Sequence, residues 1–98
     1  MRDIVHDQEF DRVAAELFGG SAESDDRLLA VEWELARAQD FGRYPLIHTC
    51  ESGRRVHYTV TEPFLPQDAV VVVFSVAQDG QSVTLHAIDW FEIEDPEC

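Results

Sequence analysis

The fold of this 98-residue chain is decided by Ala69-Val70-Val71-Val72-Val73-Phe74-Ser75-Val76, the pair Asp79-Gly80, and Ser82-Val83-Thr84-Leu85-His86-Ala87-Ile88-Asp89-Trp90. β-Branched and aromatic residues dominate both runs, and an Asp-Gly pair between such runs is a strong signal for a two-residue hairpin turn. That turn fixes a register in which alternate residues share a face. The predicted face toward the core is made by cross-strand pairs: Val76 with Val83, Phe74 with Leu85, and Val72 with Ala87.

The opposite face of this predicted hairpin is apolar in its outer half. It pairs Ser75 with Thr84, Val73 with His86, Val71 with Ile88, and Ala69 with Trp90. Soluble proteins rarely leave such a patch open unless a partner covers it. Alternatively, the segment 62–67 or the tail 91–93 folds over it. The sequence thus predicts a partner-binding surface that consists of Val71, Val73, Ile88, Trp90, Glu92 and Glu94.

A second hairpin is predicted over residues 46–60, with Ser52-Gly53 as its two-residue turn. This register places on one face the pairs Cys50 with Arg55, His48 with His57, and Leu46 with Thr59. The other face then directs Ile47, Val56, Tyr58 and Val60 toward the helices.

Two amphipathic helices are expected before these hairpins. Asp7 is a predicted N-cap, and apolar residues then recur at helical spacing from Phe10 to Leu17, until Gly19-Gly20 ends the first helix. Ser24 is the predicted N-cap of the second helix. Helices followed by strands are typical of an α+β protein, so we expect one domain over 1–98. It should consist of two N-terminal helices packed on a mainly antiparallel four- to five-stranded sheet.

Two polar residues, Glu32 and Gln39, fall within the apolar arc of the second helix. They either form a polar pocket beside the core or reach solvent at the edge of a slightly rotated helix.

Charge is the most unusual global property of the chain. Twenty acidic residues face seven basic ones, and the formal charge is −13. A surface this negative repels nucleic acid at long range, so the charge argues against direct nucleic-acid binding and favours a basic protein partner. Solubility or adaptation to salt is the alternative explanation.

No apolar run has the length of a transmembrane helix or a signal peptide, so we expect a cytoplasmic protein that does not associate with membranes.

Cysteine and histidine are the side chains that could bind a metal or act as nucleophile and base. His48, Cys50, His57 and His86 form a conceivable set, but they have neither C-x-x-C nor H-x-x-x-H spacing. A Cys50 nucleophile would have no recognisable orienting group. We therefore expect no metal, no cofactor and no catalytic residues, and we expect Cys50 and Cys98 to be free thiols.

The chain resembles RelE/ParE-like toxins. Asp3-Ile4-Val5, followed by Glu9-Phe10-Asp11-Arg12 and Leu17, resembles their opening strand and first helix, and the segment 53–60 is similar to their central arginine-bearing strand. The resemblance covers most of the chain and implies a curved antiparallel sheet backed by two helices. It also implies an alternative toxin-type site, with Arg55 at a structural or substrate-facing position. That site consists of Arg54, Arg55, His57 and His86.

The C-terminal segment departs from this family. Residues 88–98 contain no Arg, Lys or Tyr, so they offer little to stabilise the transition state of RNA cleavage. We therefore favour a non-enzymatic interaction module, such as an inhibitor, an immunity protein or an antitoxin-like protein of a phage or mobile element. It would bind a basic protein or form a homodimer. The alternative is a RelE/ParE-like toxin of a toxin–antitoxin system that cleaves RNA or inhibits another target.

Overall fold

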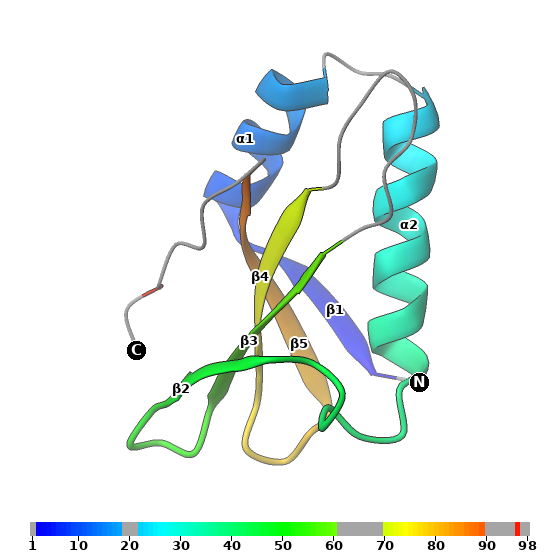
Figure 1. Ribbon diagram of the computed structural model, residues 1–98. Helices are drawn as coiled ribbons and strands as arrows, with labels where there is room; N and C mark the ends of the chain where they lie inside the picture. Colours follow the sequence, from blue (N-terminus) through cyan, green and yellow to red (C-terminus); the bar gives the residue numbers. More distant parts are fainter. Residues whose placement is uncertain (1, 19–21, 61–69, 90–95, 97–98) are drawn as a thin grey trace.

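The computed structural model describes the chain except residues 1, 19–21, 61–69, 90–95 and 97–98, and except the side chains of residues 18, 22–25 and 27. Its elements are β1 (Asp3–His6), α1 (Gln8–Phe18), α2 (Ala22–Arg37), β2 (Leu46–Thr49), β3 (Arg55–Val60), β4 (Val71–Val76) and β5 (Ser82–Asp89). The strands form a five-stranded sheet in the order β1-β5-β4-β3-β2 (Figure 1).

The α+β class is confirmed, and the rest of the expected architecture holds only in part. β1 pairs with β5 in parallel and the other three pairings are antiparallel, so the five-stranded sheet is mixed and not wholly antiparallel as the resemblance implied. A strand also precedes both helices, so they do not open the chain. The parallel pairing needs a crossover, and the helices and the β2–β4 strands supply it.

The first helix follows the sequence prediction. Asp7 caps it, because its Oδ1 accepts a hydrogen bond from the backbone N–H of Glu9 at 3.1 Å. Phe10 is buried, and Val13, Ala14 and Leu17 pack beside it against the sheet. The second helix begins at Ala22, which places Ser24 inside the helix and not at the predicted cap.

The β4–β5 hairpin has the predicted register only near its turn. Val76 pairs with Val83 and Phe74 with Leu85, as expected, and Gly80 has a positive φ of 73°. A bulge then shifts the register between Val73 and Phe74, so Val72 lies opposite Ile88 and not opposite Ala87. The extra residue is on β5, and from Ala87 onward each β5 side chain points to the face opposite to the predicted one.

The β2–β3 hairpin differs from its prediction by one residue. Its turn has three residues, because Cys50 N–H donates to Arg54 O at 2.8 Å and Gly53 N–H donates to Cys50 O at 2.9 Å. Gly53 takes a φ of 89°, as expected for a type I turn closed by a residue in the left-handed region. As a result His48 pairs with Val56, where His57 was expected.

The two faces of the sheet carry two separate apolar clusters. The helix-side core joins residues of α1 and α2 to β4 and β5. Its buried members are Phe10, Leu35, Phe41, Tyr44, Val70, Val72, Phe74, Val76, Val83, Leu85 and Ile88. The helix-free cluster has only sheet and turn residues among its described members; those that are buried are Cys50, Val56, Val71 and Val73, with Ile47, Tyr58 and Ala87 beside them. Val56 and Tyr58 therefore face away from the helices, contrary to the prediction.

Cys50 is disulfide-bonded in the structure, so the expected free thiol is wrong. The other cysteine of the sequence, Cys98, lies outside the described residues. Within the described part of the chain, no helix is long and apolar enough to cross a membrane.

Candidate functional site

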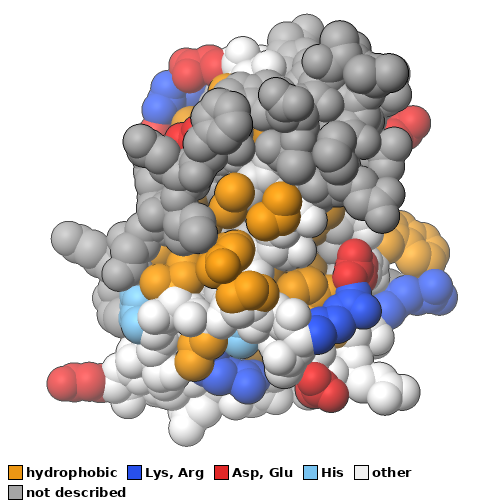
Figure 2. Space-filling view, in the orientation of Figure 1, with side chains coloured by type: hydrophobic (Ala, Val, Ile, Leu, Met, Phe, Trp, Pro, Cys, Tyr) orange, Lys and Arg blue, Asp and Glu red, His pale blue; other side chains and the backbone are white. Residues whose placement is uncertain are grey.

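The predicted partner-binding surface is divided by the sheet. Val71 and Val73 are buried in the helix-free cluster, with exposed fractions of 8% and 1%. Ile88 belongs to the helix-side core, because the bulge in β5 turns it to the other face. Trp90, Glu92 and Glu94 lie outside the described residues. Figure 2 shows hydrophobic side chains gathered in the middle of one face, with arginine and histidine side chains beside them.

The alternative toxin-type site is divided in the same way. His57 enters the helix-side core, where its ring stacks on Phe74 with centroids 5.5 Å apart and its Nδ1–H donates to Tyr44 O at 3.1 Å. Burial, followed by the charge of Arg55, lowers the pKa of His57. His86 lies on the helix-free face of the sheet. There it is hydrogen-bonded to Ser75 and is influenced by the positive charge of Arg54, not by that of Arg55. The structure therefore brings together Arg54 and His86, and separately Arg55 and His57.

The bulge residue His86 stands between a serine and a carboxylate. Its Nε2 accepts a hydrogen bond from Ser75 Oγ at 2.7 Å, and its Nδ1 lies 3.5 Å from Asp7 Oδ2. Burial, followed by the positive charge of Arg54, lowers the pKa of His86, so the ring is neutral at pH 7. These contacts follow the order of a Ser-His-Asp triad.

Accessibility argues against catalysis by this array. The nucleophile of a triad has to meet a substrate carbonyl, and Ser75 is only 1% exposed in the middle strand of the sheet. The same contacts have a structural explanation, because a buried hydroxyl and a buried imidazole both need hydrogen-bond partners. We therefore assign this array to the fixing of the bulge between β4, β5 and the β1–α1 junction.

No metal centre forms from the described residues of the histidine and cysteine set. Cys50 Sγ lies 3.8 Å from His48 Nε2, but Cys50 is in a disulfide and His57 is on the other face of the sheet. Among the described residues, no three His, Cys, Asp or Glu side chains are grouped as metal ligands.

A surface that the sequence analysis did not single out lies between α2 and β1. Leu29 and Trp33 are one turn apart on α2 and are 53% and 55% exposed. A hollow of about 270 Å³ lies beside them, also lined by Ile4 and Ala36, with Arg2 and Glu32 at its polar margin. We call this the α2–β1 groove. Large apolar side chains grouped in this way are a feature of interaction surfaces.

The groove had a sequence signal. Leu28, Val31 and Leu35 pack on the helix-side core, and Leu29, Trp33 and Ala36 form a second apolar stripe at spacings of four and three. The two stripes together make an apolar arc too broad for one sheet to bury. The apolar pattern alone did not distinguish this second stripe from the one that packs on the core.

Glu32 lies at the margin of the groove and does not simply reach solvent. His6 Nδ1 contacts Asp11 at 2.7 Å, and His6 Nε2 contacts Glu32. Burial alone would lower the pKa of His6, but the hydrogen bonds to Glu32 and Asp11 and their negative charges raise it overall. His6 thus connects β1 to both helices.

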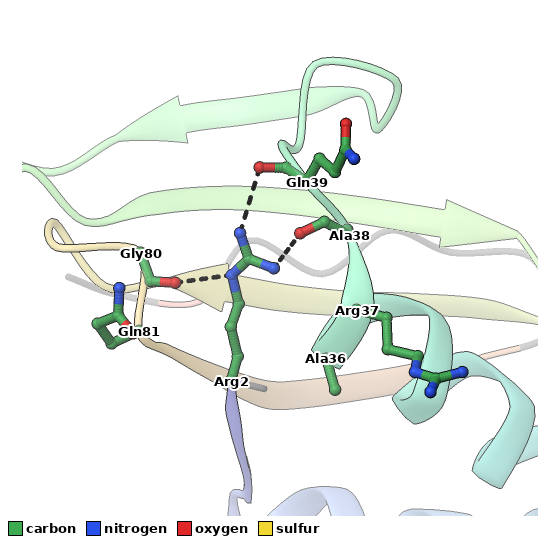
Figure 3. A pocket seen from close by; sticks show the side chains of 7 residues that line it. All are labelled: Arg2, Ala36, Arg37, Ala38, Gln39, Gly80 and Gln81. Atoms are coloured by element: carbon green, nitrogen blue, oxygen red, sulfur yellow. Dashed lines mark hydrogen bonds between the residues drawn. The ribbon is translucent and has the colours of Figure 1, made fainter.

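A larger hollow of about 590 Å³ lies at the end of α2, around Arg2 (Figure 3). The guanidinium of Arg2 donates to the carbonyl oxygens of Gly80 at 2.7 Å, of Gln39 at 3.4 Å, and of Ala38. Figure 3 shows Arg37 pointing away from these carbonyls. Carbonyl oxygens at a helix C-terminus repel anions, so this hollow is not suited to a phosphate or a carboxylate. Arg2 instead joins β1, the end of α2 and the β4–β5 turn.

No model of a known protein family matches the chain, and neither a curated protein nor a solved structure matches it significantly.

Proposed function

We propose that this protein is a non-enzymatic interaction module that binds a basic protein partner through the α2–β1 groove. The observation that carries the proposal is the exposure of Leu29 and Trp33, one turn apart, above a hollow that also contains Ile4. Tryptophan is one of the residue types enriched in binding hot spots.

The sign of the charge selects the partner. A formal charge of −13 attracts a basic surface at long range and raises its association rate at low salt. Asp26, one turn before Leu29, and Asp3 on β1 are exposed acidic residues of the two elements that form the groove. Glu32 lines the groove itself, but Arg2 does so as well, and the Arg37 guanidinium lies 4.5 Å from the centre of the Trp33 ring, so two arginines interrupt the acidic margin.

The test uses a matched pair of leucines. Leu29 and Leu46 are 53% and 54% exposed, but Leu46 lies on β2 at the opposite edge of the sheet. We expect wild type and Leu46→Ala to retain the same basic protein from host lysate at low salt and to release it at high salt. Leu29→Ala and Trp33→Ala should lose it. Equal retention by all variants would contradict the assignment of the groove, and retention of RNA or ribosomes would contradict the basic-protein function.

A second candidate function is the action of a RelE/ParE-like toxin, which the proximity of Arg54 to His86 on the helix-free face favours. Expression of a toxin would arrest growth, and His86→Ala would relieve the arrest. Wild type that is inert on expression, alone or with its neighbouring genes, would remove this candidate.

A further inference from the structure

β1 is an edge strand of the described sheet, so one of its two sides pairs with no strand of that sheet. Its order in that sheet gives it a single strand neighbour, β5. Asp3 N–H donates to Gln81 O at 3.0 Å, and Asp7 N–H donates to Leu85 O at 2.9 Å, both toward β5. Because backbone groups alternate along a strand, the N–H and C=O groups of Ile4 and His6 point to the outer edge.

α2 runs along this outer edge. Figure 1 shows the helix beside β1, and two contacts join this part of the chain to α2: Arg2 N–H donates to Ala36 O at 3.2 Å, and His6 Nε2 contacts Glu32. Farther along, the hollow of the α2–β1 groove separates Ile4 from Leu29 and Trp33. The space next to the edge of β1 is therefore bordered by outward-pointing backbone groups and by two exposed apolar side chains.

We propose that the partner binds by adding an extended segment to the outer edge of β1, as a sixth strand that packs beneath Leu29 and Trp33. This inference rests on the proposed function and specifies the structure of the bound segment. Strand addition obtains its affinity from backbone hydrogen bonds and its specificity from alternate side chains. It also explains why the apolar groove lies at a sheet edge.

The two faces of β1 specify the sequence of the segment. Ile4 packs against the helix-side core, so alternate residues of an added strand on that side meet Leu29 and Trp33 and should be apolar. Asp3 is exposed and lies on the other face, where the intervening residues should be arginine or lysine. The predicted segment thus alternates basic and apolar residues.

A second copy of this chain is a poor occupant of the same edge. Each copy carries a formal charge of −13, and each would bring its own Asp3 to the interface. Like charges opposite one another destabilise a strand pair, and net charges of this size oppose association at low salt. Charge complementarity therefore favours a basic segment.

The probe is the peptide acetyl-Arg-Val-Arg-Val-Arg-Val-Arg-amide, titrated into the whole protein at low salt. Binding should shift the amide signals of Ile4 and His6 in nitrogen-15 NMR spectra, slow their exchange with solvent, and shift the indole signal of Trp33.

The decisive variant replaces Ile4 by its α-hydroxy acid, which removes the outward N–H and keeps the side chain. That N–H is not used by β5, but the ester also makes the Asp3 carbonyl a weaker acceptor toward β5, so the thermal midpoint should fall slightly, while peptide affinity falls about fivefold for the loss of one hydrogen bond.

The outcomes separate the binding mode from the binding surface. Loss of affinity in both Leu29→Ala and the Ile4 ester, with Leu46→Ala unchanged, supports strand addition. Loss in Leu29→Ala alone overturns strand addition and leaves the groove as the docking surface. Absence of peptide binding overturns the inference, whereas the lysate experiment still decides the proposed function. A dimer in sedimentation analysis that the Ile4 ester dissociates would assign the edge to a second copy and overturn the basic segment.

Discussion

Replacement of the buried imidazole of His57 by a phenyl ring, in the variant His57→Phe, isolates the contribution of one histidine to stability. The residue is 4% exposed, its Nδ1–H donates to Tyr44 O, and its Nε2 is buried without a hydrogen-bond partner among the described residues. The substitution keeps the aromatic packing on Phe74, but it removes the donor to the buried Tyr44 carbonyl, at a cost of about 1–3 kcal/mol. It also removes the unpaired nitrogen, a gain of about the same size. At pH 8 we therefore expect a stability within about 2 kcal/mol of wild type.

The effect of pH has a definite sign. Burial lowers the pKa of His57 in the folded chain below its usual 6.5, so the unfolded chain binds a proton that the folded chain does not. Stability of the wild type is then lost as the pH falls below 6.5. At pH 5.5 an imidazole that stays neutral in the folded state accounts for a loss of at most about 1.4 kcal/mol. His57→Phe abolishes this loss.

The assay is urea denaturation followed by circular dichroism at pH 8 and pH 5.5. The free energy of unfolding of His57→Phe, relative to wild type, should rise between pH 8 and pH 5.5 by up to about 1.4 kcal/mol. Thr49→Ala, on the adjacent strand, removes no titratable group and is the control, so it should keep the wild-type pH dependence. A relative stability of His57→Phe that stays constant or falls toward pH 5.5 would refute the burial of a neutral His57.

Three further predictions concern other parts of the chain. Gly53→Ala should lower the free energy of unfolding by about 1–2 kcal/mol in thermal melts, because Gly53 has a φ of 89° and an added Cβ would lie 2.8 Å from side-chain carbons of Gln78; an unchanged midpoint would contradict the turn geometry. His6→Gln should destabilise the protein more at pH 5.5 than at pH 8.5, by under about 1 kcal/mol, because the raised pKa of His6 gives stability that is present below 6.5 and lost as the pH rises through its folded value; a larger loss at pH 8.5 would show that the contact is not ionic. Cys50 should resist alkylation in the native, unreduced protein and react after reduction, as mass spectrometry would show, and labelling without reductant would contradict its disulfide.

The sequence predicted the register next to the Asp79-Gly80 turn, although the loop between Ala77 and Ser82 has four residues and not two. Asp79-Gly80 identified the hairpin, and the pairs nearest to it, such as Val76 with Val83, are confirmed. The prediction of α1 was right for a similar reason, because Asp7 and the apolar periodicity act within one helix. The cap and the apolar periodicity of α1 depend only on neighbouring residues, so this helix could be predicted without the rest of the chain.

The sequence was insufficient where tertiary contacts decided the register. The bulge at His86 is held by Ser75 and Asp7, residues from other elements, and it reverses the facing of Ile88. An alternating pattern also predicts that a polar residue such as His57 is exposed. In the structure His57 is buried, because its Nδ1–H donates a hydrogen bond to Tyr44 O in the preceding loop. Both effects depend on residues distant in the sequence, so the predicted patch was divided between two faces.

The groove was missed for a different reason. Apolar periodicity identifies which helix residues avoid water, but it does not distinguish a stripe that packs on the sheet from one left for a partner. Leu28 and Leu29 are adjacent and chemically identical, and only the position of α2 over the sheet edge separates their roles.

The parallel pairing of β1 with β5 has a consequence for synthesis on the ribosome. The first strand of the described sheet has no strand partner until β5 has emerged from the exit tunnel. Arg2 is in the same position, because one of its carbonyl acceptors belongs to Gly80 in the β4–β5 turn. Until then the side of β1 that pairs with β5 stays open, so chaperone contact during translation should be concentrated on this strand.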